Sequence, residues 1–140
     1  MIGYEYHTTT IKNIINKIDR KKLLRPSNLP SFDWPPTLIE NLFNSILKGY
    51  PIGTFLFSEL EHKIKDVQFY VFPKEYHGNN KYESIPCDIS KQRSYAVIDG
   101  FQRLAALYIG FFGTYSDDQG TKTLYFTPQP SNLPNKRPNL

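Results

Sequence analysis

The sequence predicts an α+β domain in which a small mixed β-sheet packs with helices. Short apolar runs that are typical of strands lie between longer segments whose apolar residues recur at helical spacing. The chain has 140 residues, of which 39% are hydrophobic and 21% charged, and this composition suits one globular domain with its own core. We expect the domain to span residues 1–127. Residues 128–140 hold four prolines and are expected to form a tail or a truncated linker.

The first expected helix begins after one of the threonines at 8–10. It should end near Leu24, because Pro26 disfavours helical backbone at the residue before it. Its apolar face is spaced at i, i+3, i+4 and i+7 and consists of Ile11, Ile14, Ile15 and Ile18. A proline-bearing loop is expected to follow over residues 26–36.

A second helix is expected to begin at Pro35-Pro36 and to stop at Gly49. Its apolar stripe comprises Leu38, Ile39, Leu42, Phe43, Ile46 and Leu47. We expect Trp34, Leu38, Leu42 and Ile46 to be largely buried against the sheet. The turn Pro51-Ile52-Gly53 should then lead into a strand at residues 54–60, and a second strand is expected at 67–72.

The second half of the chain is expected to begin with a long polar segment. Residues 73–93 should form an insertion or a mobile loop with a turn at His77–Asn80. A strand is expected at 94–98, followed by a helix that ends near Phe112. A Gly/Ser/Asp-rich loop at 113–120 and a strand at 122–127 complete the expected order.

The turn between the 94–98 strand and its helix is the most informative segment. It reads Asp99-Gly100-Phe101-Gln102-Arg103. Gly100 lets the backbone approach a ligand or adopt a positive φ, and the first helical amides, which have no intrahelical acceptors, can bind an anion. Arg103 adds a forked cation that suits phosphate. The alternative is a structural turn in which Asp99 caps the helix and Arg103 is solvated or paired with Asp99.

The same segment carries a resemblance to a known family. The run VIDGFQRLAAL, residues 97–107, resembles the DGQQR motif in the N-terminal domain of GmrSD-type restriction endonucleases. Residues 32–60, with Trp34, Ser45-Ile46-Leu47 and Pro51-Ile52-Gly53, are similar to the first block of that family. Two departures stand out: Phe101 replaces the first motif glutamine, and the family's Gln-Arg shortly before the tryptophan is absent.

The resemblance implies a fold related to the ParB and sulfiredoxin folds. Relatives with that fold hold nucleotide phosphate on a Gly-x-x-Arg turn at a helix N-terminus, and Gly100 to Arg103 match this pattern. The implied function is a nucleotide-binding, NTP-hydrolysing domain of a prokaryotic restriction or phage-defence system. In this interpretation Gly100, Phe101 and Arg103 bind the nucleotide and Asp99 and Gln102 are catalytic.

Each site residue has a chemical role in this interpretation and an alternative beside it. Asp99 would bind Mg²⁺ together with phosphate oxygens or orient water, and Gln102 would orient an attacking water. The alternatives are an N-cap for Asp99 and an exposed helical position for Gln102. Phe101 suits the core or a base-stacking wall better than catalysis, and Trp34 suits the core or a pocket wall.

A non-catalytic module that binds DNA or a protein is the second candidate function. The net charge of +4 and the pI of about 9.1 suit an anionic partner. Much of this charge lies in an N-terminal run of Lys12, Lys17, Arg20, Lys21, Lys22 and Arg25. The alternative, a solvated helix face, explains the same run more simply.

The resemblance also bears on partners, because DNA cleavage in the family is usually done by a separate C-terminal HNH-type domain. This chain shows no HNH pattern, so we expect a separate nuclease domain or subunit and no nuclease activity from the chain alone. One cysteine, Cys87, excludes an intramolecular disulfide, and the three histidines lack metal-ligand spacing. The sequence shows neither a membrane span nor a signal peptide, so a cytoplasmic location is expected.

Overall fold

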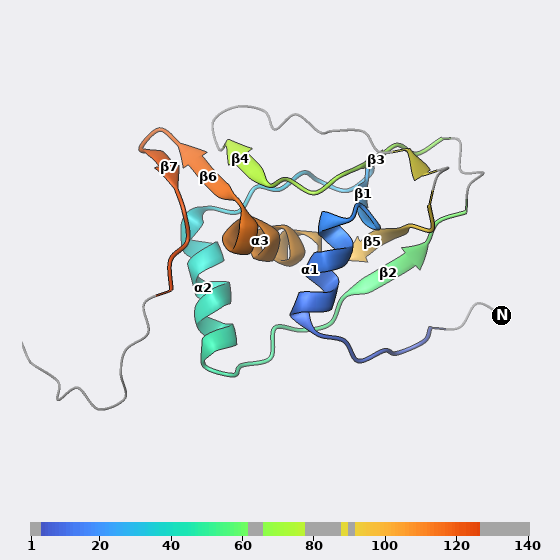
Figure 1. Ribbon diagram of the computed structural model, residues 1–140, viewed down its shortest axis with the longest axis horizontal. Coiled ribbons are helices and arrows are strands. Elements are labelled where there is room, and N and C mark those ends of the chain that lie inside the picture. The colour runs from blue at the N-terminus through green and yellow to red at the C-terminus, as the bar shows by residue number, and fades with distance from the viewer. Residues whose placement is uncertain (1–3, 62–65, 78–87, 90–91, 127–140) are drawn as a thin grey trace, which may run out of the picture.

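The computed structural model describes residues 4–61, 66–77, 88–89 and 92–126, and the described part is an α+β fold (Figure 1). Helix α3 runs through the middle, with α1 and a four-stranded sheet on one side and α2 and a three-stranded sheet on the other. The helices and strands are α1 Ile11–Asp19, β1 Leu23–Pro26, α2 Pro36–Leu47, β2 Leu56–Glu59, β3 Phe69–Tyr70, β4 Glu75–His77, β5 Tyr95–Asp99, α3 Phe101–Phe112, β6 Thr114–Asp117 and β7 Gly120–Lys122. The predicted α+β class is confirmed.

The larger sheet has the strand order β2-β5-β1-β3 and is mixed. Strand β5 runs parallel to β1 and antiparallel to β2, while β3 runs antiparallel to β1. Successive side chains point to opposite faces: Leu23 and Val97 join the core under α1 and α3, whereas Leu24 and Ala96 join a smaller cluster on the other face. The motif turn therefore follows an inner strand that is covered on both faces.

Helix α1 is shorter than the sequence suggested. Thr10 caps it by accepting a hydrogen bond from the amide of Asn13 at 3.2 Å, as expected, but the helix ends at Asp19 instead of near Leu24. Lys21 has a φ of +60°, and the amides of Lys21 and Lys22 bond back to the last turn of α1. This left-handed residue stops the helix early, which frees residues 23–26 to form β1 at the centre of the sheet.

Helix α2 lies against α3 and not against the sheet, so the predicted burial of its stripe is only partly right (Figure 1). Leu42 is buried, and Ile46 and Trp34 are half-buried, but Leu38 is 41% exposed. Because α3 lies between α2 and the sheet, only a narrow strip of α2 is covered. The predicted stop is confirmed: Gly49 has a φ of +74° and its amide bonds to the carbonyl of Ile46 at 3.0 Å.

The three-stranded sheet corrects three expectations. Residues 113–120 are not a loop: β6 covers 114–117 and pairs antiparallel with β7, which covers 120–122 and replaces the expected strand at 122–127. Within the polar segment 73–93, Glu75–His77 form β4, parallel to β6. A Cβ on Gly113 would lie 1.7 Å from the carbonyl oxygen of Lys74, so a glycine is needed where these strands approach.

Some further expectations fall outside the described residues. The expected turn at 77–80 falls mostly outside them, as do the expected tail at 128–140 and Cys87. Strand β3 confirms a strand within 67–72 but is limited to two residues. In the described segments no helix is both long and apolar enough to cross a membrane, and α2 and α3 reach twelve residues each.

Candidate functional site

The predicted strand–turn–helix arrangement of the motif is confirmed. Strand β5 ends at Asp99 and α3 begins at Phe101, with Gly100 as the N-cap at φ +96°. This backbone conformation is strained for any residue with a side chain. A Cβ on Gly100 would also lie 2.4 Å from Cδ1 of Phe55. Glycine is therefore required here both by the backbone conformation and by the close approach of an aromatic ring.

The start of α3 presents backbone donors that no side chain caps. The amide of Leu104 makes the first intrahelical hydrogen bond, to the carbonyl of Gly100 at 3.0 Å. The amides of residues 101–103 therefore lack intrahelical acceptors, and Gly100 supplies no capping side chain. The carboxylate of Asp99, a described residue, does not cap these amides either. Free amides and the positive end of the helix dipole favour an anion at this position.

The guanidinium of Arg103 lies beside this helix start. Its Nη1 donates to the carbonyl of Ile52 at 2.5 Å and its Nη2 donates to the carbonyl of Thr54 at 2.9 Å. Nη2 is also 3.2 Å from the position that a Cβ on Gly100 would occupy. Both Arg103 and Asp99 are described, and they form no ion pair with each other. Arg103 is thus held near Gly100 by the loop before β2.

The two sequence blocks, residues 32–60 and 97–107, meet around this guanidinium. Gly53 has a φ of +93°, and a Cβ there would lie 2.6 Å from Nη1 of Arg103. The ring of Phe55 lies under the guanidinium, with its centroid 4.6 Å from Cζ. The sequence shows Pro51-Ile52-Gly53 as part of the first family-like block but does not indicate that this segment contacts Arg103. Nothing in the local pattern signals a contact between residues fifty positions apart.

Gln102 fastens a different loop to α3. Its Nε2 donates to the carbonyl of Ser31 at 3.0 Å, and its Oε1 accepts from the amide of Asp33 at 3.1 Å. Both ends of the side-chain amide are therefore engaged by the backbone of the segment before Trp34. This segment is also where the sequence departs from the pattern of the family that it resembles.

Phe101 and Asp99 point to different environments. Phe101 lies in the core, 5% exposed, with its ring 5.0 Å from that of Phe72, so little of it is left to contact a ligand. Asp99 is exposed at the end of β5, and its carboxylate has no hydrogen bond to another described residue. No group of three or more His, Cys, Asp or Glu side chains in the described segments could hold a metal ion. A single carboxylate suits Mg²⁺ only when phosphate oxygens complete the coordination.

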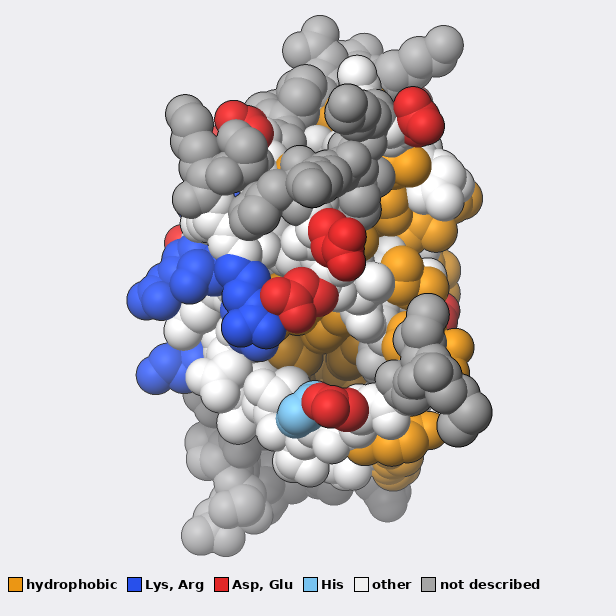
Figure 2. Space-filling view, turned by 90° about the vertical axis from the view of Figure 1, so that its right-hand side faces the viewer, with side chains coloured by type: hydrophobic (Ala, Val, Ile, Leu, Met, Phe, Trp, Pro, Cys, Tyr) orange, Lys and Arg blue, Asp and Glu red, His pale blue; other side chains and the backbone are white. Residues whose placement is uncertain are grey.

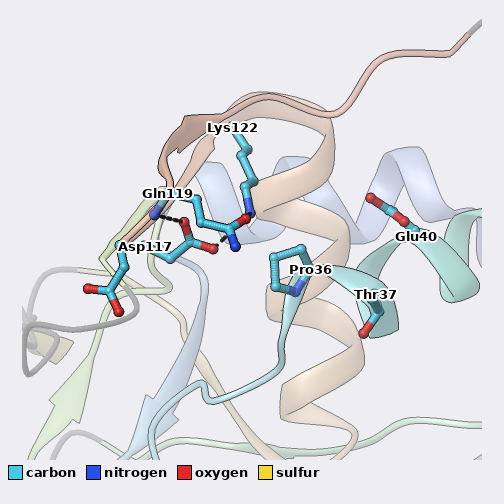
Figure 3. Close-up of a pocket in the computed structure, with 7 residues that line it drawn as sticks. Pro36, Thr37, Glu40, Asp117, Gln119 and Lys122 are labelled. Carbon is cyan, nitrogen blue, oxygen red and sulfur yellow. Dashed lines mark hydrogen bonds and ion pairs between the residues drawn. The ribbon is translucent and has the colours of Figure 1, made fainter.

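A shallow hollow of about 410 Å³ lies elsewhere, between the first turn of α2 and the β6–β7 turn (Figure 3). It is lined by Pro36, Thr37, Glu40, Asp117, Asp118, Gln119 and Lys122. Lys122 donates to Asp117 at 2.8 Å, and the amide of Gln119 donates to the same carboxylate at 2.9 Å. The hydrogen bond from Lys122, and to a smaller extent that from the Gln119 amide, lowers the pKa of Asp117. No residue of the motif lines this hollow, and three of its polar residues, Asp117, Gln119 and Lys122, hydrogen-bond to one another.

A basic surface forms where α1 meets the segment before β5. Lys17 Nζ lies 5.7 Å from the centroid of the Tyr95 ring, and Arg93 Cζ lies 5.8 Å from it. Gln92 donates to the carbonyls of Arg20 and Lys21 at 3.3 and 3.0 Å, which brings the two segments together. Lys and Arg side chains also gather at one side of the face in Figure 2. We call Lys17, Arg20, Lys21, Lys22 and Arg93 the basic surface.

Two residues modify the charge of the basic surface. Arg93 forms an ion pair with Glu59 through two hydrogen bonds of 2.5 and 3.0 Å, which lowers the pKa of that carboxyl. Arg25, which belongs to the same basic run in the sequence, does not reach the surface. It is 5% exposed, donates to the carbonyl of Leu29 and stacks 4.8 Å from the Tyr70 ring. Of the basic run in the sequence, Arg25 therefore does not belong to the basic surface, whereas Arg93, which lies outside that run, does.

A comparison with known families identifies one match. Residues 11–138 match the family model described as GmrSD restriction endonuclease, N-terminal domain. The matched region contains both motif blocks and every helix and strand of the structure. No curated protein matches the chain.

Proposed function

The chain belongs to the family of GmrSD restriction endonuclease N-terminal domains, and from this premise we propose that its β5–α3 turn binds the phosphates of a nucleoside triphosphate. One observation carries the proposal. The uncapped amides of residues 101–103 and the guanidinium of Arg103 converge on Gly100 at the start of α3. The domain would thus serve a restriction or phage-defence system as its nucleotide-binding part.

The electrostatics of the turn support an anionic ligand. A helix N-terminus and a guanidinium are both favourable for phosphate, and their effects reinforce each other when they lie together. Arg103 uses two of its five N–H groups on the Ile52 and Thr54 carbonyls, so the others remain for a ligand. The absence of a side chain at Gly100 lets the Phe55 ring and Nη2 of Arg103 lie directly beside the helix start.

Hydrolysis of the bound nucleotide is the finer part of the proposal, with Asp99 and Gln102 as the candidate catalytic residues. A Mg²⁺ ion shared between Asp99 and phosphate oxygens would neutralise negative charge on the nucleotide. Gln102 would orient an attacking water only by giving up one of its two hydrogen bonds to the loop of residues 31–33. The structure therefore supports a weak or regulated hydrolysis better than a fast one.

Calorimetric titration with each of the four Mg²⁺–NTP complexes tests this proposal. Arg103→Ala should weaken binding about tenfold or more, since a charge-assisted contact to phosphate contributes roughly 1.5–3 kcal/mol. Arg93→Ala, which removes an exposed arginine outside the turn, is the matched control and should bind as the wild type does. Asp99→Asn should retain binding while any phosphate release falls. Equal affinity in all three variants would refute the assignment of the site.

Binding of DNA through backbone phosphates is a second candidate function, which the basic surface favours. Residues from α1 and from the segment before β5 place positive charge around Tyr95, a half-buried ring. Such an arrangement suits phosphate contacts that position a duplex without reading its sequence. Fluorescence anisotropy with duplex DNA separates the two functions: Lys17→Ala with Lys21→Ala should reduce DNA affinity and its salt dependence, and Arg103→Ala should not.

Cleavage of DNA in the complete system is assigned here to a separate HNH-type nuclease domain or subunit. The resemblance supports this division of labour, because the motifs of this chain match the N-terminal part of the family. Incubation of the isolated chain with plasmid DNA, Mg²⁺ and NTP should therefore leave the plasmid intact. Nicking or linearisation that disappears in Asp99→Asn would contradict the assignment.

A further inference from the structure

We propose that Phe55 is a positioning residue of the nucleotide-phosphate site. In this proposal, which rests on the function proposed above, the ring of Phe55 holds the guanidinium of Arg103 beside the first amides of α3. Phe55 itself does not contact the ligand. Its contribution to affinity comes through Arg103.

The Phe55 ring lies against both the guanidinium and the helix start. The centroid of the Phe55 ring is 4.6 Å from Cζ of Arg103, which is within the range of a cation–π interaction. The ring also lies against Gly100, because a Cβ there would come within 2.4 Å of Cδ1. The neighbouring ring of Phe57 is nearly parallel, at 9° and 6.4 Å between centroids, and both rings pack against the main core.

Phe55 and the two backbone carbonyls together hold the guanidinium of Arg103 in place. The hydrogen bonds to Ile52 and Thr54 hold one side of the guanidinium, and the Phe55 ring, whose centroid is 4.6 Å from Cζ, packs against it. A free arginine side chain would lose considerable rotamer freedom on binding an anion, whereas one that is already held loses less. The segment of residues 51–55 is therefore the second half of the phosphate site, although it carries no charged side chain of its own.

The two glycines leave room for this arrangement. Gly53 and Gly100 both have positive φ angles, and side chains at these positions would meet Arg103 and Phe55 respectively. One glycine comes from each of the two sequence blocks. Their close approach to the same guanidinium–ring pair indicates that the pair, and not the turn alone, is the functional unit.

Substitutions that remove or keep the aromatic ring test the proposal. Phe55→Leu and Phe55→Met keep an apolar side chain without the ring, and Phe55→Tyr keeps the ring. The probes are Mg²⁺–ATP, Mg²⁺–GTP and inorganic tripolyphosphate, each titrated by calorimetry. We expect both ringless variants to bind all three probes about two- to fivefold more weakly, the range that a cation–π contact implies. Phe55→Tyr should keep wild-type affinity. A role that depends only on side-chain volume would not require the ring.

Direct observation of the guanidinium in the wild-type protein supplies a readout that does not depend on the Phe55 variants folding. In wild-type protein labelled with ¹⁵N-arginine, the Nε–Hε signal of Arg103 should shift on addition of tripolyphosphate. The signal is assigned by its absence in Arg103→Lys. An Arg103 signal that does not respond to a tripolyphosphate that binds would overturn the proposal.

Each other outcome is decisive as well. Weaker binding of the two nucleotides with unchanged binding of tripolyphosphate would show that Phe55 stacks on the base, which overturns a positioning role. Wild-type affinity in both ringless variants would overturn the inference and leave the proposed function standing. If the wild type binds none of the three probes, the proposed function fails and the inference fails with it.

Discussion

The guanidinium of Arg103 donates a hydrogen bond of 2.5 Å to the backbone carbonyl of Ile52, fifty-one residues earlier in the chain. This contact joins the turn at the start of α3 to the loop before β2. Arg103 therefore has a structural role in addition to the proposed binding role. Any substitution at this position has to be measured for stability as well as for affinity.

Arg103→Ala should lower the free energy of unfolding by about 1–3 kcal/mol. The variant loses two charge-assisted hydrogen bonds, to Ile52 and Thr54, and the contact with the Phe55 ring. Arg103→Lys, which keeps the charge but not the fork, should recover only part of the loss. Urea denaturation measures both values. A loss under about 0.5 kcal/mol in Arg103→Ala would mean that the clamp does not stabilise the fold.

Leu42→Ala should lower the free energy of unfolding by about 2–5 kcal/mol, because Leu42 is 8% exposed between α2 and α3. Leu38→Ala is the matched control on the same helix. Leu38 is 41% exposed, so its truncation should cost under about 1 kcal/mol. Chemical denaturation of the two variants distinguishes them. Similar losses at both positions would place Leu38 in the core and contradict the observed orientation of α2.

Lys21→Gly should stabilise the protein by about 0.5–1 kcal/mol. Lys21 holds a φ of +60° after α1, which strains a residue with a side chain by about 1–2 kcal/mol, and glycine relieves this at some cost in unfolded-state entropy. Lys22→Gly is the control. Its backbone is not left-handed, so glycine there should destabilise by roughly 0.5–1 kcal/mol. Thermal unfolding that shows the opposite order would contradict the assigned end of α1.

Tyr108→Phe should lower stability by about 0.5–1.5 kcal/mol at neutral pH, because Tyr108 Oη donates to the Asp19 carboxylate at 2.8 Å. Burial, followed by this hydrogen bond and the nearby charge, raises the pKa of Tyr108 well above its ordinary value. The stabilisation is therefore fully present below pH about 10, the unfolded value, and is lost as pH rises towards the folded pKa.

Comparing wild type with Tyr108→Phe separates the effect of Tyr108 from that of the other tyrosines whose pKa values are raised. Burial also raises the pKa of Tyr76 and Tyr115, so the wild-type protein loses stability in alkali for more than one reason. The difference in unfolding free energy between wild type and Tyr108→Phe removes their contribution. This difference should shrink above pH about 10. A difference that is constant from pH 7 to 11 would show that Tyr108 does not titrate with folding.

The motif turn was predictable because its signals are local. A short apolar run before Asp99-Gly100 and helical spacing after it identify a strand, a turn and a helix without knowledge of the rest of the chain. The end of α1 was not predictable in the same way. Lys21 adopts a conformation that usually calls for glycine, so the sequence pointed to Pro26 as the stop. The β6–β7 hairpin was missed because its Ser, Asp and Gly residues are typical of loops.

The contacts within the candidate site depend on tertiary packing. The sequence identified Gly100, Gln102 and Arg103 as candidates, but the partners of Gln102 and Arg103 are backbone atoms of distant loops. A hydrogen bond to a backbone carbonyl does not constrain which side chain that residue carries, so the sequence gives no sign of it. Gly53 is the one residue whose identity reflects the contact, because a side chain there would meet Arg103, but a glycine after Pro51-Ile52 is also typical of an ordinary turn.

Nuclear magnetic resonance of ¹⁵N-labelled protein titrated with Mg²⁺–NTP tests the central claim most directly. The account predicts saturable shifts of the backbone amides of Phe101, Gln102 and Arg103, because these are the donors that a phosphate at the start of α3 would engage. Amides around Tyr95 on the basic surface should shift little. Absence of any shift at residues 101–103 at millimolar NTP, or shifts confined to the basic surface, would contradict the account.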